Sequence, residues 1–269
     1  MRTIHIPREE RASFQQRLAE LERTFSYPLG ADSFTLDHGP DYFAFFDRLG
    51  EVAYHAVLDG AVLVGVACGV LRRVPDREGG PQRSAWYLCD LKVLPSYRGR
   101  RLPERLLLHR ILCNYLKCRR GYGITMNPSQ GDNRVVRLAG RMRRPVQLGS
   151  SAELRIYSLD SEGMRAAAPA IVAHRGPIGY LSLAGKKDLV LGSTGARMPL
   201  LHVQAGPCGA TAGTFAEPRP GHTHMFCAPG GDALARACEE AGIQPAATAA
   251  IVSRGMEGSD WRFVLTSDI

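Results

Sequence analysis

Arginines, a glycine and a proline lie close together between a predicted strand and a predicted helix, in the stretch YRGRRLPERLL at residues 97–107. A helix that begins directly after a buried strand presents its first unpaired N–H groups and the positive end of its dipole to one point, where phosphate binds. Gly99 allows close approach of the backbone, or a positive φ, and Arg98, Arg100 and Arg101 can add charge-assisted hydrogen bonds. The pattern predicts a pyrophosphate site.

Three residues near this stretch could move protons. Asp90, on the strand before the arginines, could act as a general base directly or through water, if burial raises its pKa. Tyr87 and His55 are two further candidates for proton transfer. Each also has a plain structural interpretation, because an aspartate at a strand end often holds a turn or an arginine, and a single His or Tyr on a strand is usually hydrogen-bonded in the core.

The elements that must position these residues follow from hydrophobic periodicity and turn residues. Asp59-Gly60 separates two β-rich runs and predicts an antiparallel hairpin over residues 52–74. The apolar run at residues 84–95 predicts a strand in the interior of the sheet. The remaining predictions for the first part of the chain are helices over 7–25, 42–48, 102–117 and 131–142, and strands over 122–128 and 152–159.

Beyond Asp160 the sequence becomes rich in alanine, glycine and proline, so we place a boundary near residues 160–169. This predicts two domains, residues 1–160 and residues 161–269. The second is expected to be a folded α+β unit with one helix, over 231–242, and strands over 180–185, 188–193, 199–206, 246–256 and 261–268. Residues 238–253 could form a helix-turn-strand unit that echoes the end of the first domain.

Composition narrows the class of protein. The 269 residues carry a formal net charge of +8, which suits a nucleotide-bearing cofactor, an acidic substrate or nucleic acid. The seven cysteines are dispersed and form no CxxC pair, which disfavours a disulfide scaffold and a zinc ribbon. His222, His224 and Cys227 resemble metal ligands only superficially, so no metal is expected. Without an apolar leader or an 18-residue apolar run, we expect a cytoplasmic protein that does not enter membranes.

The stretch LKVLPSYRGRRLPERLL, within this order of elements, resembles the acetyl-CoA-binding core of the GNAT superfamily of N-acyltransferases over roughly residues 34–159. Val93, Pro95, Arg98 and Gly99 match the family pattern. Arg101 stands where the family has a glycine at the start of the helix. Pro103 replaces Gly or Ala and removes one N–H donor, for which the Arg101 side chain could compensate.

A second segment, GDNRVVRLAGRM, resembles a later helix of the family. Asp132 falls at the position of the family's Asn, and Leu138 at that of its Leu. Ala139 falls where many members carry the tyrosine that protonates the departing CoA thiolate. That acid is therefore absent from its usual place, and plain amphipathic packing accounts for this helix at least as well as a catalytic part.

The resemblance implies an α/β (α+β) fold with a GNAT-like mixed, mainly antiparallel sheet flanked by helices, followed by a C-terminal α+β extension. It also implies that acetyl-CoA, or another acyl-CoA, is the co-substrate. In GNAT proteins the strand before the phosphate loop separates from its neighbour, and its freed backbone groups bind pantetheine and the thioester oxygen. The residues assigned to acyl-CoA binding in this way are Leu91, Val93, Arg98, Gly99, Arg100, Arg101, Leu102 and Pro103.

The implied reaction moves an acetyl or longer acyl group to a primary amine of a small molecule or peptide. Two alternatives stay open. One is an enzyme like N-acyl amino acid or acyl-homoserine-lactone synthases, whose acidic acyl carrier protein would suit the basic charge. The other is a non-catalytic CoA-binding regulatory module, which the missing tyrosine favours. The extension could complete the acceptor site or form an oligomer interface, such as a homodimer. Nucleic acid is a disfavoured partner, because no recognition motif is present and the arginines are not interleaved with exposed aromatics.

Overall fold

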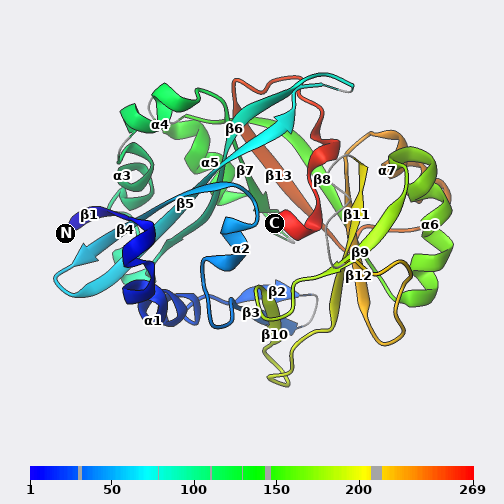
Figure 1. The fold of residues 1–269 in the computed structure, drawn as a ribbon, viewed down its shortest axis with the longest axis horizontal. Coiled ribbons are helices and arrows are strands. Elements are labelled where there is room, and N and C mark those ends of the chain that lie inside the picture. Colours follow the sequence, from blue (N-terminus) through cyan, green and yellow to red (C-terminus); the bar gives the residue numbers. More distant parts are fainter. Residues whose placement is uncertain (30–31, 78, 110, 129, 143–146, 207–213) are drawn as a thin grey trace.

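The computed structural model describes residues 1–29, 32–77, 79–109, 111–128, 130–142, 147–206 and 214–269. Its described part contains a sheet of ten strands in the order β1-β4-β5-β6-β7-β13-β8-β12-β11-β9 (Figure 1). The strands are β1 (Arg2–Ile6), β4 (Glu51–Asp59), β5 (Val62–Pro75), β6 (Gln82–Val93), β7 (Gly121–Met126), β8 (Gly149–Leu159), β9 (Ile178–Ser182), β11 (Leu200–Ala205), β12 (Thr223–Pro229) and β13 (Ala247–Arg254). A small second sheet has the order β10 (Asp188–Leu191), β3 (Asp32–Asp37), β2 (Tyr27–Leu29).

Helices flank the large sheet, so the predicted fold class is confirmed. They are α1 (Arg11–Glu22), α2 (Ala44–Asp47), α3 (Leu102–Leu108), α4 (Ile111–Lys117), α5 (Arg134–Arg141), α6 (Ser161–Arg175) and α7 (Ala233–Glu240). Short 3-10 turns are η1 (Arg8–Glu10), η2 (Pro95–Tyr97), η4 (Trp261–Phe263) and η5 (Thr266–Asp268). Among the residues described, no helix is both long enough and apolar enough to cross a membrane.

The strand order has an approximate internal two-fold symmetry. The first half of the chain, residues 1–160, contains the unit β7-α5-β8, and the second half, residues 161–269, contains the equivalent unit β12-α7-β13. The last strands of the two units, β8 and β13, pair in the middle of the sheet, with β7 beyond β13 and β12 beyond β8. Each outer strand then has a parallel neighbour, β6 beside β7 and β11 beside β12.

The sheet therefore continues across the predicted boundary at residue 160. Strand β13 comes from the far end of the chain, yet it lies between β7 and β8 of the first half (Figure 1). The first half cannot complete its sheet without it, since β7 pairs with β13 on one side and with β6 on the other. Whether residues 1–160 and 161–269 behave as two domains stays a prediction.

The main hydrophobic core lies between the sheet and helices α1 and α2, and the second half adds residues of β13 and η4 to it. Helix α1 buries Phe14, Leu18 and Leu21, whose spacing places them on one face. Helix α2 adds Phe45 and Phe46, which pack edge to face with ring centroids 5.2 Å apart. Burial of such side chains stabilises the fold by roughly 1.5–3 kcal/mol each, and α3 and α5 pack in smaller clusters outside this core.

Several elements differ from the predictions, and strands β1, β2, β3 and β12 were not predicted at all. The single helix over 102–117 is two, because the backbone at His109 is extended with ψ 124°. Helix α6 was missed: Asp160 caps its start by accepting from Gly163 N, and it runs on through Pro169. The segment 261–268, predicted as a strand, forms η4 and η5, whose apolar residues pack beside the sheet instead of pairing within it.

Candidate functional site

Strands β6 and β7 run side by side for only a short distance. Their parallel pairing extends from Trp86 opposite Gly121 to Leu88 opposite Gly123. Beyond that point β6 continues to Val93, while the rest of β7 pairs with β13. The two strands thus separate, and Leu91, on the stretch of β6 that has left β7, is 37% exposed. Backbone groups on that edge of β6 are available to a ligand.

A β-bulge lies in the same stretch of β6. Val66 of β5 pairs with Lys92, and Cys68 pairs with Cys89, so two residues of β6 face the single residue Ala67. The first of the two, Asp90, has a φ of 51°. In a bulge of this type the residue with left-handed backbone is ordinarily a glycine. Asp90 therefore adopts a left-handed backbone conformation that is ordinarily unfavourable for residues other than glycine.

The carboxylate of Asp90 is enclosed on the side of the sheet that faces α1. Its side chain is 3% exposed. Oδ2 accepts from the Tyr54 hydroxyl and lies 3.1 Å from the Tyr42 hydroxyl, while Oδ1 pairs with Lys92 Nζ. Lys92 Nζ also pairs with Glu22 Oε2 of α1 at 2.8 Å. We call Glu22, Tyr42, Tyr54, Asp90 and Lys92 the carboxylate cage.

Both tyrosines of the cage remain hydrogen-bond donors at ordinary pH. Burial is the largest cause that raises the pKa of Tyr42 and of Tyr54 well above the usual value. The Tyr42 hydroxyl also lies 2.9 Å from Glu22 Oε2, so it is shared between two carboxylates. The cage therefore ties β6 to α1, β4 and the segment before α2 through charge-assisted contacts.

The three predicted proton-transfer residues lie in three separate surroundings. Tyr87 is buried and stacks on Tyr122 with ring centroids 5.0 Å apart, and burial raises its pKa well above the usual value. His55 belongs to the opposite face of the sheet, between the rings of His5 and His109 at 5.4 Å each. Asp90 lies in the carboxylate cage. Their assigned roles stay predictions.

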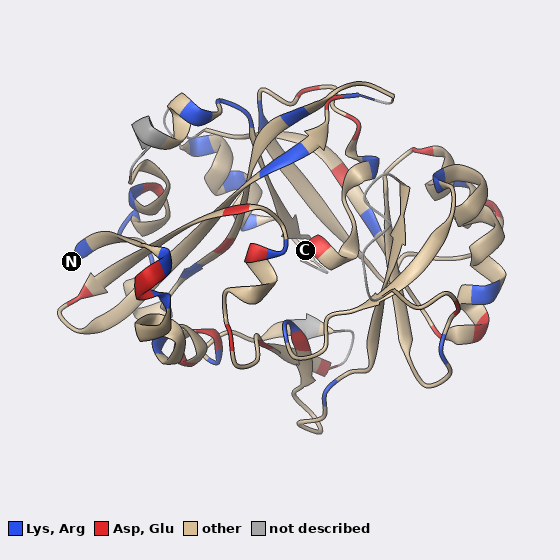
Figure 2. Ribbon diagram, in the orientation of Figure 1, with Lys and Arg blue, Asp and Glu red and all other residues tan. Residues whose placement is uncertain are grey.

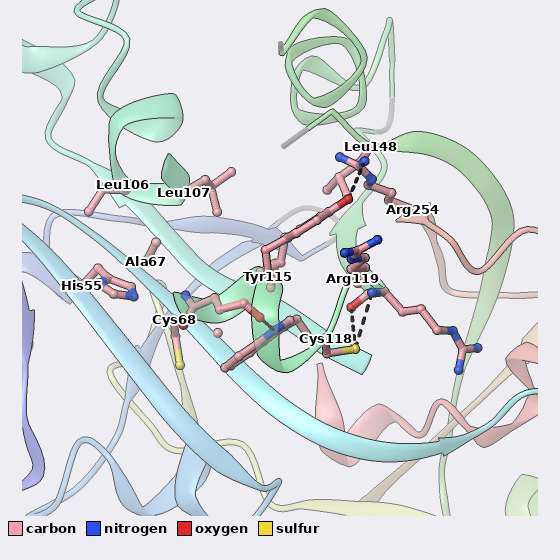
Figure 3. Close-up of a pocket in the computed structure, with 16 residues that line it drawn as sticks. His55, Ala67, Cys68, Leu106, Leu107, Tyr115, Cys118, Arg119, Leu148 and Arg254 are labelled. Atoms are coloured by element: carbon pink, nitrogen blue, oxygen red, sulfur yellow. Dashed lines mark hydrogen bonds between the residues drawn. The ribbon is translucent and has the colours of Figure 1, made fainter. Parts of the chain in front are cut away.

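A pocket lies between the sheet and helices α3 and α4, and His55 lines it. In Figure 3 the His55 ring and the side chains of Leu106 and Leu107 border this pocket on one side, with Tyr115 and Arg254 across from them. The Tyr115 hydroxyl accepts from Arg254 Nη2 at 3.3 Å. Because Tyr115 is on α4 and Arg254 ends β13, the pocket wall depends on the second half of the chain.

The loop after β6 reaches α3 through a second left-handed residue. Arg101 has a φ of 57° and occupies the position before the first residue of α3, where the resemblance expects glycine. Its guanidinium pairs with Glu104 at 2.6 Å, and its side chain is 69% exposed. Arg98 is exposed, and a Cβ built on Gly99, whose φ is 79°, would meet no atom within 4 Å. The loop is open to a ligand on this side.

The start of α3 offers fewer donors than an ordinary helix. The first helical bond runs from Arg105 N to Arg101 O, and Pro103 has no N–H. Leu102 and Glu104 then supply the backbone donors of the first turn. Leu102 itself is buried against Val93 and Leu106, which fixes the loop between the end of β6 and the helix. Figure 2 shows further basic residues on α5 and at the end of α4.

The later helix of the resemblance, α5, is capped at its start by Asn133. Asn133 accepts from Val135 N and Val136 N, while Asp132 lies outside the helix and is exposed. Ala139 is buried against Leu148 and Val252. A side chain at position 139 therefore belongs to a packed cluster in this chain.

Glu22, Lys92 and Tyr42 were missed at the level of the sequence. They come from α1, from β6 and from the segment before α2, so no spacing along the chain links them. The sequence contained one indication of these contacts. Lys92 lies two residues from Asp90, and a lysine in a strand that is otherwise expected to be buried needs an acidic partner.

The segment between β9 and β10, in the second half of the chain, lies close to the carboxylate cage. His38 Nδ1 lies 3.2 Å from Lys186 O, and His38 Nε2 lies 3.8 Å from Glu22 Oε2. Burial is the main reason that the pKa of His38 is lowered to about 3 and that of Lys187 to about 8. The Lys187 ammonium lies 4.2 Å from the ring centre of Phe45.

Two histidines of the second half, His202 and His224, have structural partners. His224 Nε2 accepts from Arg219 N at 3.0 Å, and His202 Nδ1 lies 3.1 Å from the Thr266 hydroxyl. In the part of the chain that is described, no group of three or more His, Cys, Asp or Glu side chains could hold a metal ion.

Comparison with known proteins gives similarity at the level of the fold. No family model matches the sequence. The chain is 25% identical over 236 residues to the uncharacterized protein L340 of Acanthamoeba polyphaga mimivirus, which covers 85% of this chain and 68% of that protein. Among solved structures, a tandem GNAT protein from the clavulanic acid biosynthesis pathway matches 96% of this chain and 100% of its own, with 13% identity and a TM-score of 0.49. The aminoglycoside 6'-N-acetyltransferase from Enterococcus faecium matches 49% of this chain and 64% of its own, with 17% identity and a TM-score of 0.35.

The chain's own topology is the firmer basis for the fold. The mixed, mainly antiparallel sheet, the hairpin of β4 and β5 before β6, the separation of β6 from β7, and the helix after β6 are what the sequence resemblance to the GNAT core implied. The GNAT-like fold is therefore confirmed.

Proposed function

We propose that this chain is a GNAT-type acyltransferase that moves an acetyl or longer acyl group from acyl-CoA to a primary amine. The observation that carries the proposal concerns the backbone. Asp90 and Arg101 are the only non-glycine residues with positive φ in the described ranges, and both lie within one strand-loop-helix unit. Strained backbone of this kind tends to cluster at functional sites.

The exposed edge of β6 would hold the pantetheine and the thioester. Leu91 and Val93 contribute main-chain groups there, on the stretch that has separated from β7. Arg98, Gly99, Arg100 and the first turn of α3 would bind the pyrophosphate, and Arg101 would add its charge. The residues present fit acyl-CoA, because the freed edge and the open side of Gly99 belong to one continuous segment.

The reaction needs position, charge stabilisation and a route for protons. A neutral amine attacks the thioester carbonyl carbon, an oxyanion forms, the attacking nitrogen gives up a proton, the C–S bond breaks, and the departing thiolate takes up a proton. Main-chain N–H groups of β6 would stabilise the oxyanion. Tyr87 and His55 remain proton-transfer hypotheses, although their burial favours solvent or the substrate as the carrier of protons.

The acceptor would be a small molecule or a peptide. A cytoplasmic location belongs to the same proposal, as does the absence of a resident metal. In the carrier-protein alternative, the same edge of β6 binds the pantetheine arm. The donors differ only in the group attached to the phosphate, which is a nucleotide in CoA and a protein in the acyl carrier. In the regulatory alternative, the chain binds acyl-CoA but transfers no acyl group.

One experiment separates these readings. Calorimetric titration with acetyl-, octanoyl- and palmitoyl-CoA measures binding, and release of free thiol against a panel of amines measures transfer. We expect binding and amine-dependent thiol release. Transfer from acyl carrier protein but not from CoA would favour the alternative donor. Binding without transfer to any amine would favour the regulatory module, and no binding to either donor would overturn the proposal.

A further inference from the structure

The backbone conformation of Asp90 is unfavourable for a residue with a side chain, and its carboxylate is too enclosed to exchange protons readily as a general base. It is the left-handed residue of the β6 bulge, a position that suits glycine. Aspartate is one of the few other residues that tolerate this conformation, because its short polar side chain can bond locally. The reason for an aspartate here must lie in the contacts of its carboxylate.

Those contacts use both carboxylate oxygens. Oδ2 faces the hydroxyls of Tyr42 and Tyr54, and Oδ1 faces Lys92. The side chain is almost completely buried, whereas the neighbouring Leu91 is exposed. The backbone of the bulge thus lies at the edge of the candidate site while the carboxylate is turned into the core. A base must exchange protons with substrate or water, and this carboxylate is enclosed by donors that it already uses.

The cage is also anchored independently of β6. Lys92 and Tyr42 both contact Glu22, which belongs to α1 and is itself buried. Tyr54 comes from β4, two strands away from β6 in sequence order. Because its partners lie on other elements, the carboxylate can hold the bulge against relaxation to an ordinary strand.

We propose that Asp90 is a positioning residue and not the general base: a residue that holds positive φ at this position keeps the left-handed bulge of β6, so that the main chain beside Leu91 faces the acyl group, and the caged carboxylate is what lets an aspartate hold it. The proposal rests on the acyltransferase function proposed above. In this proposal the backbone of the bulge contributes to catalysis, and the Asp90 side chain acts only by holding that backbone in place. Glu22, Tyr42, Tyr54 and Lys92 then support the reaction without touching the substrate.

Substitutions at residue 90 separate the two roles. Asp90→Gly removes the carboxylate but favours positive φ, and Asp90→Asn keeps the shape and still tolerates the left-handed conformation. Asp90→Val fits the size of the site and disfavours positive φ. A positioning role therefore predicts that the Gly and Asn variants keep kcat within about threefold, while the Val variant loses at least about tenfold, less than the roughly hundredfold loss for a removed oxyanion donor because the donor is only displaced.

The measurements are kcat, KM for acyl-CoA and the pH profile of kcat for each folded variant, with φ at residue 90 read from the three-bond coupling between its amide and Cα protons. We expect unchanged pH profiles, and a fall in kcat for Asp90→Val that exceeds any change in KM. Losses of about a hundredfold in both Asp90→Gly and Asp90→Asn, together with loss of the acidic limb, would make Asp90 the base and overturn the proposal.

A folded Asp90→Val variant with wild-type kcat would also overturn the proposal, because the bulge would then have no bearing on the rate. Lys92 keeps its Glu22 partner in all three variants, so none of them leaves a buried charge without a counter-ion. If the wild-type protein binds no acyl-CoA, the proposed function fails as well. If the wild type transfers acyl groups and Asp90→Gly does not, only the positioning role fails.

Discussion

The two parallel strand pairs of the sheet have the same topology but very different surroundings. Beyond the last pair of β6 with β7, Leu91 is exposed. Beyond the last pair of β11 with β12, at His202 and Met225, the next residues of β11 are buried. Gln204 is only 1% exposed there, and its amide donates to the Ser267 hydroxyl at 3.0 Å. A separated strand pair thus forms a candidate site only where the chain leaves its edge open.

The halves differ in backbone conformation as well. Both positive-φ residues other than glycine lie in the first half, within the part of the chain that is described. A helix follows β6 and returns to the sheet, whereas the described residues of 206–222, between β11 and β12, contain no helix. The second half completes the sheet through β13 and packs its last residues against β11 and β12. The repeated topology is thus common to both halves, whereas the strained segment is found only in the half that carries the candidate site, within the residues described.

The largest effect should come from separating the halves. We expect residues 1–160 alone to lose cooperative folding, because β7 and β8 lose the strand that pairs with both of them. Circular dichroism melting of the fragment, beside the full chain, measures this. Limited proteolysis that quickly leaves an active core ending near residue 160 would instead show that the second half is dispensable.

Acid should weaken both halves through buried histidines. Burial lowers the pKa of His38 in the first half and of His202 in the second to about 3, with Lys187 adding to both effects and Lys92 to that of His38. The unfolded chain binds protons below about pH 6.5 and the folded chain does not, so stability is full above that pH and falls toward pH 3.

Each of these histidines should cost on the order of 2 kcal/mol between pH 7 and pH 5. The measurement is urea unfolding at the two pH values, with His38→Gln and His202→Gln as separate variants. Each variant should lose about half of the pH dependence that the pair provides. A pH dependence that survives in full in one variant would place the acid sensitivity in the other half.

We expect the arginines of the loop between β6 and α3 to contribute to acetyl-CoA binding, and exposed arginines of the second half not to contribute. Replacing Arg98 and Arg101 together by Ala should weaken acetyl-CoA binding at least tenfold, or about 1.4 kcal/mol. The matched control is Arg219→Ala with Arg236→Ala, which removes the same charge from exposed positions of the second half. Equal losses in both pairs would point to net charge instead of a site, and calorimetry decides between them.

The smallest effect concerns the strain at Arg101. Arg101→Gly relieves a left-handed conformation, which outweighs the added freedom of the unfolded chain, so we expect a gain of about 0.5 kcal/mol in unfolding free energy. Arg100→Gly is the control, since Arg100 is not among the residues with positive φ and should only lose stability. A loss of stability in Arg101→Gly would mean that the ion pair with Glu104 holds the loop more strongly than expected.

Much of the first half could be predicted locally. The Asp59-Gly60 turn lies in the hairpin of β4 and β5, and both this turn and the apolar stripe of α1 depend on neighbours in sequence. Segment 261–268 could not be predicted in this way, because its alternation of apolar residues suits a strand as well as a buried 3-10 turn. The partners of Asp90 were equally out of reach, since Glu22 and Tyr54 come from other elements.

By itself, the sequence determined the type of most elements, the strand-loop-helix unit of residues 84–108, and the cluster of arginines in its loop, because periodicity, turn chemistry and charge act over a few residues. Only the tertiary structure decided that β13 lies between β7 and β8, that β6 leaves β7 after Leu88, and that the Asp90 carboxylate turns into the core. Those outcomes depend on which distant surfaces bury one another and on where buried charges find counter-ions, and such free energies arise only when the chain is folded.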